Sequence, residues 1–274
     1  MMLCFAAMSL GRAARFVTAA AAASVLLLAS AGRTARPRRA AAADWQPAGW
    51  GGGGLFWAAA FHPTKPDVIY MGGDVGGVYR SDDAGAHWRM INHGLTNYAV
   101  YSLATGPAAP DTIYAGTTGG LSRSTDGGLH WTFLPETARA QLHITAERGK
   151  SIRSIALDPV DSHVLYAGTP LGFVSTRTDS GDHWTKVYAV PKGSISSVMV
   201  NAHDPRQIYA ATSAAGLVRS ADGGATWQDL KTPSSANSVA IAPSDAKVLL
   251  GGFGAAGIYR STDGGQTWQK VATR

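Results

Sequence analysis

The stretch Ser81-Asp82-Asp83-Ala84-Gly85-Ala86-His87-Trp88 decides the fold, because its pattern S-x-D-x-G-x-x-W recurs along the chain. Three further segments fit the pattern: 124–131, 220–227 and 261–268. A fifth, 177–184, keeps the aspartate, glycine and tryptophan but begins with Arg177. The five tryptophans follow one another at intervals of 43, 53, 43 and 41 residues. A period of this length is typical of propellers and solenoids.

Each repeat places the same parts upstream of the motif. An apolar stretch and a turn are followed by a strand, a glycine-rich segment and a second strand, which are 68–70 and 78–80 in the first repeat. The tryptophan opens one more short strand. Four short strands per repeat predict an all-β propeller of five four-stranded blades. Residues 44–47 resemble a fourth strand, yet 267–271 already supply one to the fifth blade, so we expect an incomplete or open ring.

The motif has the chemistry of a hairpin clamp between the third and fourth strands of a blade. Its carboxylate can accept backbone N–H bonds, its glycine supplies a positive φ, and its tryptophan can pack between blades. A calcium or catalytic array is the alternative, but five separate blades cannot converge on one ion. We therefore assign a structural role, and no metal or cofactor, to Asp83, Asp126, Asp179, Asp222 and Asp263.

The first 43 residues differ from the rest of the chain. Arg12 and Arg15 precede an uncharged run, 16–31, that ends in small residues. This pattern predicts a cleavable signal peptide and leader over 1–43, followed by the propeller domain over 44–274, in a secreted or periplasmic protein that leaves the membrane after cleavage. The run is shorter than the roughly 20 apolar residues of a membrane span, although an uncleaved anchor is the alternative.

The net charge of +6 does not indicate a nucleic-acid partner. All six excess charges are arginines of the leader, so the remaining chain is neutral and has no electrostatic footprint for polyphosphates. The single cysteine, Cys4, also lies in the leader. The propeller domain therefore has no disulfide, cysteine nucleophile or thiolate ligand.

Function on a propeller is expected where the blades differ, and the first difference is Asp74. It lies in the glycine-rich turn between the second and third strands of the first blade, and no other blade has an acid there. Loops between the second and third strands open on the opposite side from the motif turns. Asp74 is therefore a candidate site residue near the channel, and a turn-capping carboxylate is the alternative.

Two other segments distinguish the blades. An insertion of roughly 135–150 contains Glu136 and Glu147, which emerge on the side of Asp74 and are candidate acids or ordinary surface residues. Near the start of the domain, Trp50, Phe56 and Trp57 surround a run of four glycines. These aromatic residues are candidates for stacking on sugar rings, and burial in the first blade is the alternative.

The motif resembles the Asp-box, or BNR, repeat of sialidases, family 74 glycoside hydrolases, sortilin-like propellers and the photosystem II assembly factor. Segments 61–70 and 73–80 are similar to the opening of the family 74 xyloglucanases. That resemblance implies that Asp74 matches the general base of an inverting endo-β-glucanase. In the family the partner acid comes from a second propeller, which this chain lacks, so the enzyme assignment stays open.

The resemblance implies a secreted propeller that acts on or binds β-glucan polysaccharide. The alternative is a non-catalytic scaffold that binds a protein or glycan, as the photosystem II assembly factor does. A partner chain or second propeller is the expected source of a missing acid. Inverting hydrolysis needs two carboxyls about 6.5 to 9.5 Å apart, and the sequence identifies one of them.

Overall fold

A computed structural model describes residues 54–134, 151–170, 173–177, 184–190 and 193–271. In these ranges the chain forms five four-stranded antiparallel sheets and one 3-10 turn, η1 (Gly254–Ala256). The prediction of an all-β propeller with five blades is therefore confirmed. The leader and residues 44–53 lie outside the described residues.

Each sheet is one blade, and its strands pair in chain order. The first two blades are β1 (Phe56–Phe61), β2 (Ile69–Gly73), β3 (Val78–Ser81) and β4 (Arg89–Met90), then β5 (Val100–Gly106), β6 (Ala109–Thr117), β7 (Gly120–Ser124) and β8 (Thr132–Phe133). The third is β9 (Ser154–Leu157), β10 (Leu165–Gly168), β11 (Phe173–Arg177) and β12 (Thr185–Ala189). The last two are β13 (Ile195–Asn201), β14 (Asp204–Thr212), β15 (Gly216–Ser220) and β16 (Gln228–Asp229), then β17 (Ser238–Ala242), β18 (Asp245–Gly252), β19 (Ile258–Ser261) and β20 (Gln269–Lys270).

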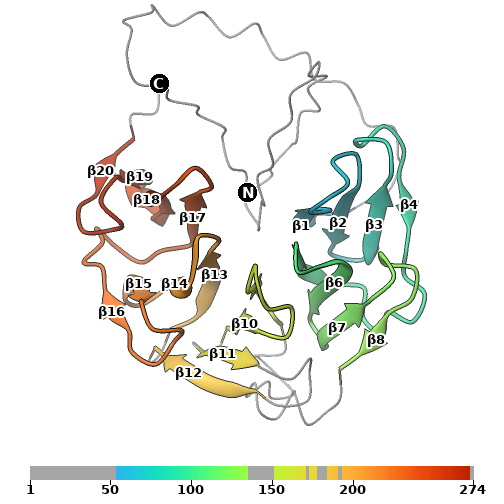
Figure 1. Ribbon diagram of the computed structural model, residues 1–274, viewed down its shortest axis with the longest axis horizontal. Coiled ribbons are helices and arrows are strands. Elements are labelled where there is room, and N and C mark those ends of the chain that lie inside the picture. Colours follow the sequence, from blue (N-terminus) through green and yellow to red (C-terminus); the bar gives the residue numbers. More distant parts are fainter. Residues whose placement is uncertain (1–53, 135–150, 171–172, 178–183, 191–192, 272–274) are drawn as a thin grey trace, which may run out of the picture.

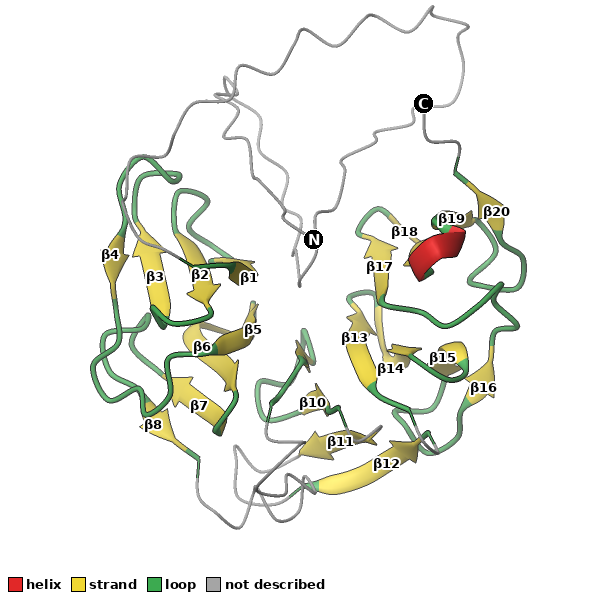
Figure 2. Ribbon diagram, turned by 180° about the vertical axis from the view of Figure 1, so that it is seen from behind, coloured by secondary structure: helices red, strands yellow, loops and turns green. Residues whose placement is uncertain are grey.

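The blades follow one another around an arc. Strands β1, β13 and β17 lie nearest its centre, and β4, β8, β12, β16 and β20 lie at the rim (Figure 1). Contacts of β5 with β1 and β9, and of β13 with β9 and β17, join successive blades. Figure 2 shows the same arc from behind, with the first and last sheets on either side of its opening. Among the described residues no strand pairing joins these two sheets, in agreement with the open ring predicted from the repeats.

The core consists of four apolar layers, one in each interface between consecutive blades. Tyrosines of the second strands lie in these layers almost without solvent contact: Tyr70, Tyr114, Tyr166 and Tyr209. In the second and fourth blades, which have a neighbour on each side, the last five residues of the second strand, 113–117 and 208–212, are all buried. This explains why these segments lack an alternation of apolar and polar residues.

The S-x-D-x-G-x-x-W segments form turns between the third and fourth strands. In the second blade the buried Ser124 hydroxyl donates to Asp126 at 2.7 Å and accepts the N–H of Gly128 at 2.9 Å. The Asp126 carboxylate accepts the N–H of His130 at 2.9 Å. The turns at Asp83, Asp222 and Asp263 have the same bonds, and Asp179 lies outside the described residues.

Hydrogen bonds between blades use the equivalent carbonyl in three of these turns, that of the glycine immediately after the aspartate. Arg80 donates to Gly127 O at 2.7 Å, Tyr166 to Gly223 O at 3.2 Å, and Arg219 to Gly264 O at 3.4 Å. Each donor belongs to the blade that precedes the accepting turn. The arc has two ends along its central axis. The motif turns fasten each blade to its neighbour at one end, and the loops between the second and third strands lie at the other.

Candidate functional site

Asp74 follows β2 and lies at the start of β1, at the end of the arc away from the motif turns. Its N–H donates to Leu55 O at 2.9 Å. Thr118 and Ser213 make the equivalent bond in the second and fourth blades. This shared bond shows that the three residues occupy one structural position, which in the first blade holds the carboxylate.

The side chain of Asp74 differs from its equivalents in what it contacts. The Thr118 hydroxyl donates to Asn97 at 2.6 Å, and the Ser213 hydroxyl accepts the N–H of Ser194 at 2.8 Å. The half-buried Asp74 carboxylate instead lies against Gly54, where an added Cβ would overlap with Oδ1. No described residue donates a hydrogen bond to that carboxylate. Within the described residues, the group is therefore positioned by its backbone and its contact with Gly54.

Asn92 holds the loop that carries Asp74. Its side-chain oxygen accepts the N–H of Val78 at 2.7 Å, and its side-chain nitrogen donates to Gly76 O at 2.7 Å. Gly77 closes the turn with φ +76° and donates to Tyr98 O at 3.0 Å. Two segments that follow the first blade, one at Asn92 and one at Tyr98, thus fix the backbone on the C-terminal side of Asp74.

Three side chains from the first three blades stack at the end of the arc that carries Asp74, and we call them the ladder: Trp57, Tyr101 and Arg153. The Trp57 and Tyr101 rings are 4.2 Å apart between centroids, with only 3° between their planes. The Arg153 guanidinium carbon lies 4.4 Å from the Tyr101 centroid. Because a ring has two faces and Trp57 covers one, the guanidinium takes the other.

The ladder residues occupy equivalent positions in their blades. Trp57 and Tyr101 are extra residues at β-bulges near the start of β1 and β5, and Arg153 immediately precedes β9. In each case the next residue pairs with one of the last two residues of the second strand: Ala58 with Gly72, Ser102 with Gly116 and Ser154 with Gly168. A bulge re-aims its side chain. The ladder thus lies on the inner strands at the Asp74 end of the arc.

The other aromatic candidates are only partly placed. Phe56 packs edge-to-face on Tyr79 with centroids 5.7 Å apart and is 37% exposed. Tyr98, next to the Asp74 loop, is 52% exposed. Trp50 and both candidate acids, Glu136 and Glu147, lie outside the described residues. The structure therefore brings Asp74, Phe56 and Trp57 to one end of the first blade and leaves the remaining candidates untested.

The aspartates of the motif turns have a different environment from Asp74. The backbone and side chain of His87 hold the pKa of Asp83 down to about 2, and the hydroxyl and N–H of Thr226 do the same for Asp222. The hydroxyl and N–H of Thr267 lower the pKa of Asp263 further. Such carboxylates stay charged and hydrogen-bonded at neutral pH, so they are poorly suited to accept a proton as a general base.

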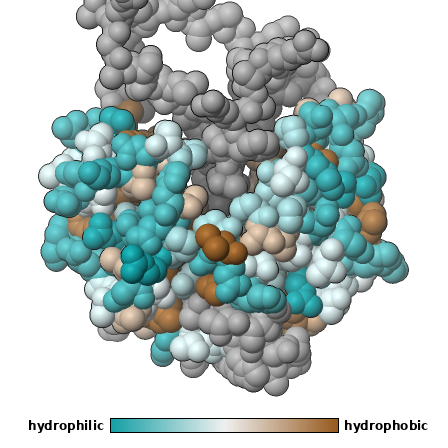
Figure 3. Space-filling view, viewed as in Figure 1, coloured by the Kyte–Doolittle hydropathy of each residue, from teal (hydrophilic) through white to brown (hydrophobic). Residues whose placement is uncertain are grey.

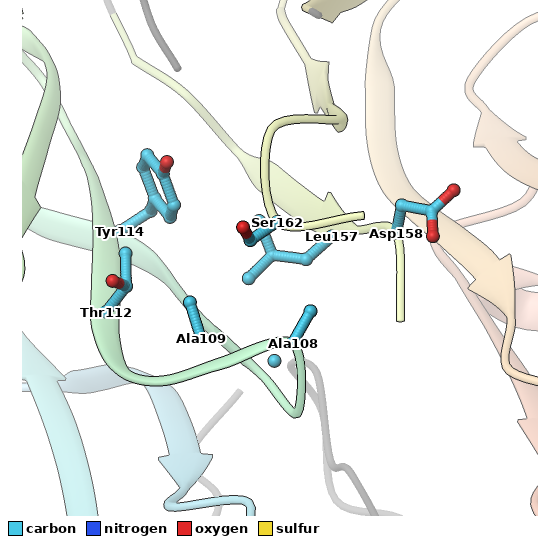
Figure 4. Close-up of a pocket in the computed structure, with 8 residues that line it drawn as sticks. Ala108, Ala109, Thr112, Tyr114, Leu157, Asp158 and Ser162 are labelled. Atoms are coloured by element: carbon cyan, nitrogen blue, oxygen red, sulfur yellow. The ribbon is translucent and has the colours of Figure 1, made fainter. Parts of the chain in front are cut away.

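The described ranges contain no candidate metal site. No group of three or more His, Cys, Asp or Glu side chains there could hold an ion. A small, mostly apolar hollow lies at the opposite end, between the turns β5–β6 and β9–β10 (Figure 4). Leu157 points into it, whereas the Asp158 carboxylate points away and caps its own turn.

The outer surface shows no broad apolar face on the side drawn in Figure 3. Hydrophilic residues cover most of it, and apolar ones form small separate groups, one of them beside the centre of the arc. No helix among the described residues is long and apolar enough to cross a membrane.

Comparison of sequences finds similarity to xyloglucanases. Xyloglucanase Xgh74A of Acetivibrio thermocellus is 30% identical over 221 residues, covering 65% of this chain and 26% of that protein. A xyloglucanase of a Paenibacillus species is 28% identical over 216 residues, covering 64% and 21%. The chain resembles the propeller of family 74 xyloglucanases. It spans only about a quarter of the length of these curated relatives. The sortilin and neurotensin receptor 3 family model also matches residues 172–274.

Solved structures agree on the propeller fold. An ancestral GH74 enzyme superimposes with a TM-score of 0.66 at 24% identity, covering 83% of this chain and 32% of the enzyme. YCF48 bound to D1 peptide gives 0.56 at 20% identity, covering 79% and 67%. YCF48 from Cyanidioschyzon merolae gives 0.52 at 20% identity, covering 80% and 85%. At these identities the likeness shows the fold alone.

Sequence reasoning missed Tyr101, Arg153 and Asn92. The signal for the first two was present, because aligning the blades on the inner strand places Trp57, Tyr101, Arg153, Ser196 and Asn237 in one column. That column is as varied as the one containing Asp74. Asn92 had no such signal, since its two bonds depend on how the chain returns beneath the Asp74 loop.

Proposed function

We propose that this chain binds β-glucan polysaccharide at the end of the arc that carries Asp74 and the ladder. The observation that carries the proposal is that an aromatic stack and a carboxylate with no described donor lie at the same end of the arc. The apolar face of a sugar ring can pack on the face of the Trp57 indole that Tyr101 leaves uncovered, and a carboxylate accepts hydrogen bonds from sugar hydroxyls. Sequence similarity to two xyloglucanases supports a glucan as the ligand.

Asp74 is the candidate general base if the chain also cleaves its ligand. In inverting hydrolysis a base removes a proton from the water that attacks the anomeric carbon, while an acid protonates the departing oxygen. Among the described residues, Asp74 is the only carboxylate in a loop between the second and third strands. The acid must therefore come from elsewhere, and Glu136, Glu147 or another polypeptide are the sources we propose. Glucan binding without efficient turnover is the expected behaviour of the isolated chain.

A protein-binding scaffold is the second candidate function. The observation that favours it is coverage, because this chain matches 67% and 85% of two YCF48 chains but only 32% of the ancestral GH74 enzyme. A single propeller of this kind needs no second carboxylate. The two functions differ in the ligand that occupies the same end of the arc.

The first experiment compares binding and turnover for three proteins: the wild type, Trp57→Ala and Asp74→Asn. Titration calorimetry with xyloglucan and mixed-linkage β-glucan should give binding by the wild type and about tenfold weaker binding by Trp57→Ala. Asp74→Asn should keep most of the binding and lose about two to four orders of magnitude of any hydrolytic rate. Leu129→Ala is the matched control, because Leu129 is 49% exposed and lies on the motif turn at the opposite end.

Absence of binding to every glucan would reject this function and favour the scaffold. Equal turnover by the wild type and Asp74→Asn would remove Asp74 from any reaction. Thermal melts of all variants separate these outcomes from simple loss of folding.

A further inference from the structure

Arg153 is held more firmly than an ordinary surface arginine. Its guanidinium carbon lies 4.4 Å from the centroid of the Tyr101 ring, and its Nε donates to the hydroxyl of Ser151 at 3.1 Å. Ser151 is buried, whereas Arg153 is exposed. The Tyr101 contact and the Nε bond together restrain the guanidinium, so the edge formed by its two terminal nitrogens has a preferred orientation.

Within the described residues that edge has no counterion. Arg80 and Arg89 pair with Asp82 at 2.6 and 3.2 Å, and Arg206 pairs with Asp204 at 3.3 Å. No described residue bonds the terminal nitrogens of Arg153. Two parallel N–H donors on a fixed guanidinium edge match the two oxygens of a carboxylate, and charge-assisted pairs of this kind are among the strongest hydrogen bonds in proteins.

We propose that Arg153 binds the carboxylate of an acidic sugar, a hexuronate, within the glycan that occupies the ladder. The proposal rests on the proposed function and narrows its ligand from a neutral glucan to one that carries uronate residues. Asp74 repels an anion at the Trp57 end, so a neutral ring belongs there and the uronate belongs on the third blade. The ligand thus has a direction along the ladder.

A sugar carboxylate fits the surroundings better than a peptide carboxylate. Arg153 is continuous with the Trp57–Tyr101 stack, and the flat indole suits a pyranose ring whose C–H groups form an apolar face. Among the described residues no other ring covers the second face of Trp57. A single ligand that spans several blades can therefore supply both the carboxylate that Arg153 binds and the ring that packs on Trp57.

The test uses two ligands that differ only in the acidic group. Cellohexaose is neutral, and the same oligosaccharide oxidised to glucuronate only at the primary hydroxyl of its non-reducing terminal ring carries a single acidic group. The wild type should bind the acidic form at least about tenfold more tightly, as one added charge-assisted bond predicts. Arg153→Gln should bind both forms equally. The preference should also shrink as salt is raised, because the new attraction is between exposed charges.

Arg206→Gln is the matched control, since Arg206 is an exposed arginine at the opposite end. Equal affinity of the wild type for both ligands, with neutral binding intact, overturns this inference and leaves the proposed function standing. Binding of neither oligosaccharide rejects both. Tight binding of a peptide with a free carboxyl terminus, lost in Arg153→Gln while the acidic sugar does not bind, also overturns it.

Discussion

The indole of Trp57 lies parallel to the phenol of Tyr101, 4.2 Å between centroids, although the two residues belong to different blades. Tyr101 in turn carries the Arg153 guanidinium on its other face. Removing the middle member should therefore disturb both ends. The Trp57–Tyr101 contact also makes the orientation of the candidate sugar platform depend on the angle between the first two blades.

Tyr101→Ala should expose Trp57 and lower the free energy of unfolding by about 2 kcal/mol, the combined size of an aromatic pair and a cation–π contact. The signal of Trp57 is isolated by subtracting the fluorescence of the same variant with Trp57→Phe. We expect a red-shifted emission that is quenched more readily by acrylamide. Tyr101→Phe keeps the ring and should resemble the wild type. An unchanged Trp57 spectrum in Tyr101→Ala would contradict the ladder.

Asn92→Ala should loosen the loop of Asp74. The variant leaves the N–H of Val78 and the carbonyl of Gly76 without their partner, at a cost of about 1 to 3 kcal/mol per buried group. Hydrogen exchange at Gly77 and Val78 should accelerate, and glucan affinity should fall with it. Asn97→Ala is the matched control, because Asn97 bonds the equivalent loop of the second blade at Thr118. Equal effects of the two variants on exchange at Val78 would refute the specific role of Asn92.

Trp131→Ala should destabilise the propeller without weakening ligand binding by the folded protein. Trp131 is 4% exposed and donates to Ile91 O of the first blade at 2.6 Å. Loss of a buried tryptophan costs about 3 to 5 kcal/mol, and Trp131→Phe should cost less because it keeps most of the packing. Urea unfolding measures the difference. A stable variant that has lost glucan binding would instead make the motif turns part of the ligand site.

Stability should fall in acid because of the motif aspartates. The bonds from His87 and Thr226 lower the folded-state pKa of Asp83 and Asp222 from 3.8 to about 2. A depressed folded-state pKa adds stability above the unfolded-state pKa, and that stability is lost as pH falls through the folded-state value. The melting temperature should therefore decline between about pH 4 and pH 2. Asp222→Asn should show a shallower decline, and an identical slope would count against the assignment.

Export should remove the leader. The arginines at 12 and 15 and the uncharged run at 16–31 have the charge and length of a cleavable signal. N-terminal sequencing of secreted protein should begin between Gly32 and Asp44. Retention of Met1 on an exported, membrane-bound product would support the anchor alternative.

The sequence by itself determined the blades, the position of each motif turn and the end of the arc that bears Asp74. These features are local. The bonds among Ser124, Asp126 and Gly128 close within five consecutive residues, so a short pattern is enough to specify them. The side of Asp74 followed from strand alternation, since successive antiparallel strands must reverse direction.

Only the tertiary structure decided what surrounds Asp74. Trp57, Tyr101 and Arg153 are far apart in the chain and meet because two bulges, in β1 and β5, and the residue before β9 hold equivalent positions on three neighbouring inner strands. Asn92 reaches the Asp74 loop only after the chain has passed through the motif turn and β4. Such contacts depend on the packing of whole blades through buried residues, and no short pattern encodes the angle at which two blades pack.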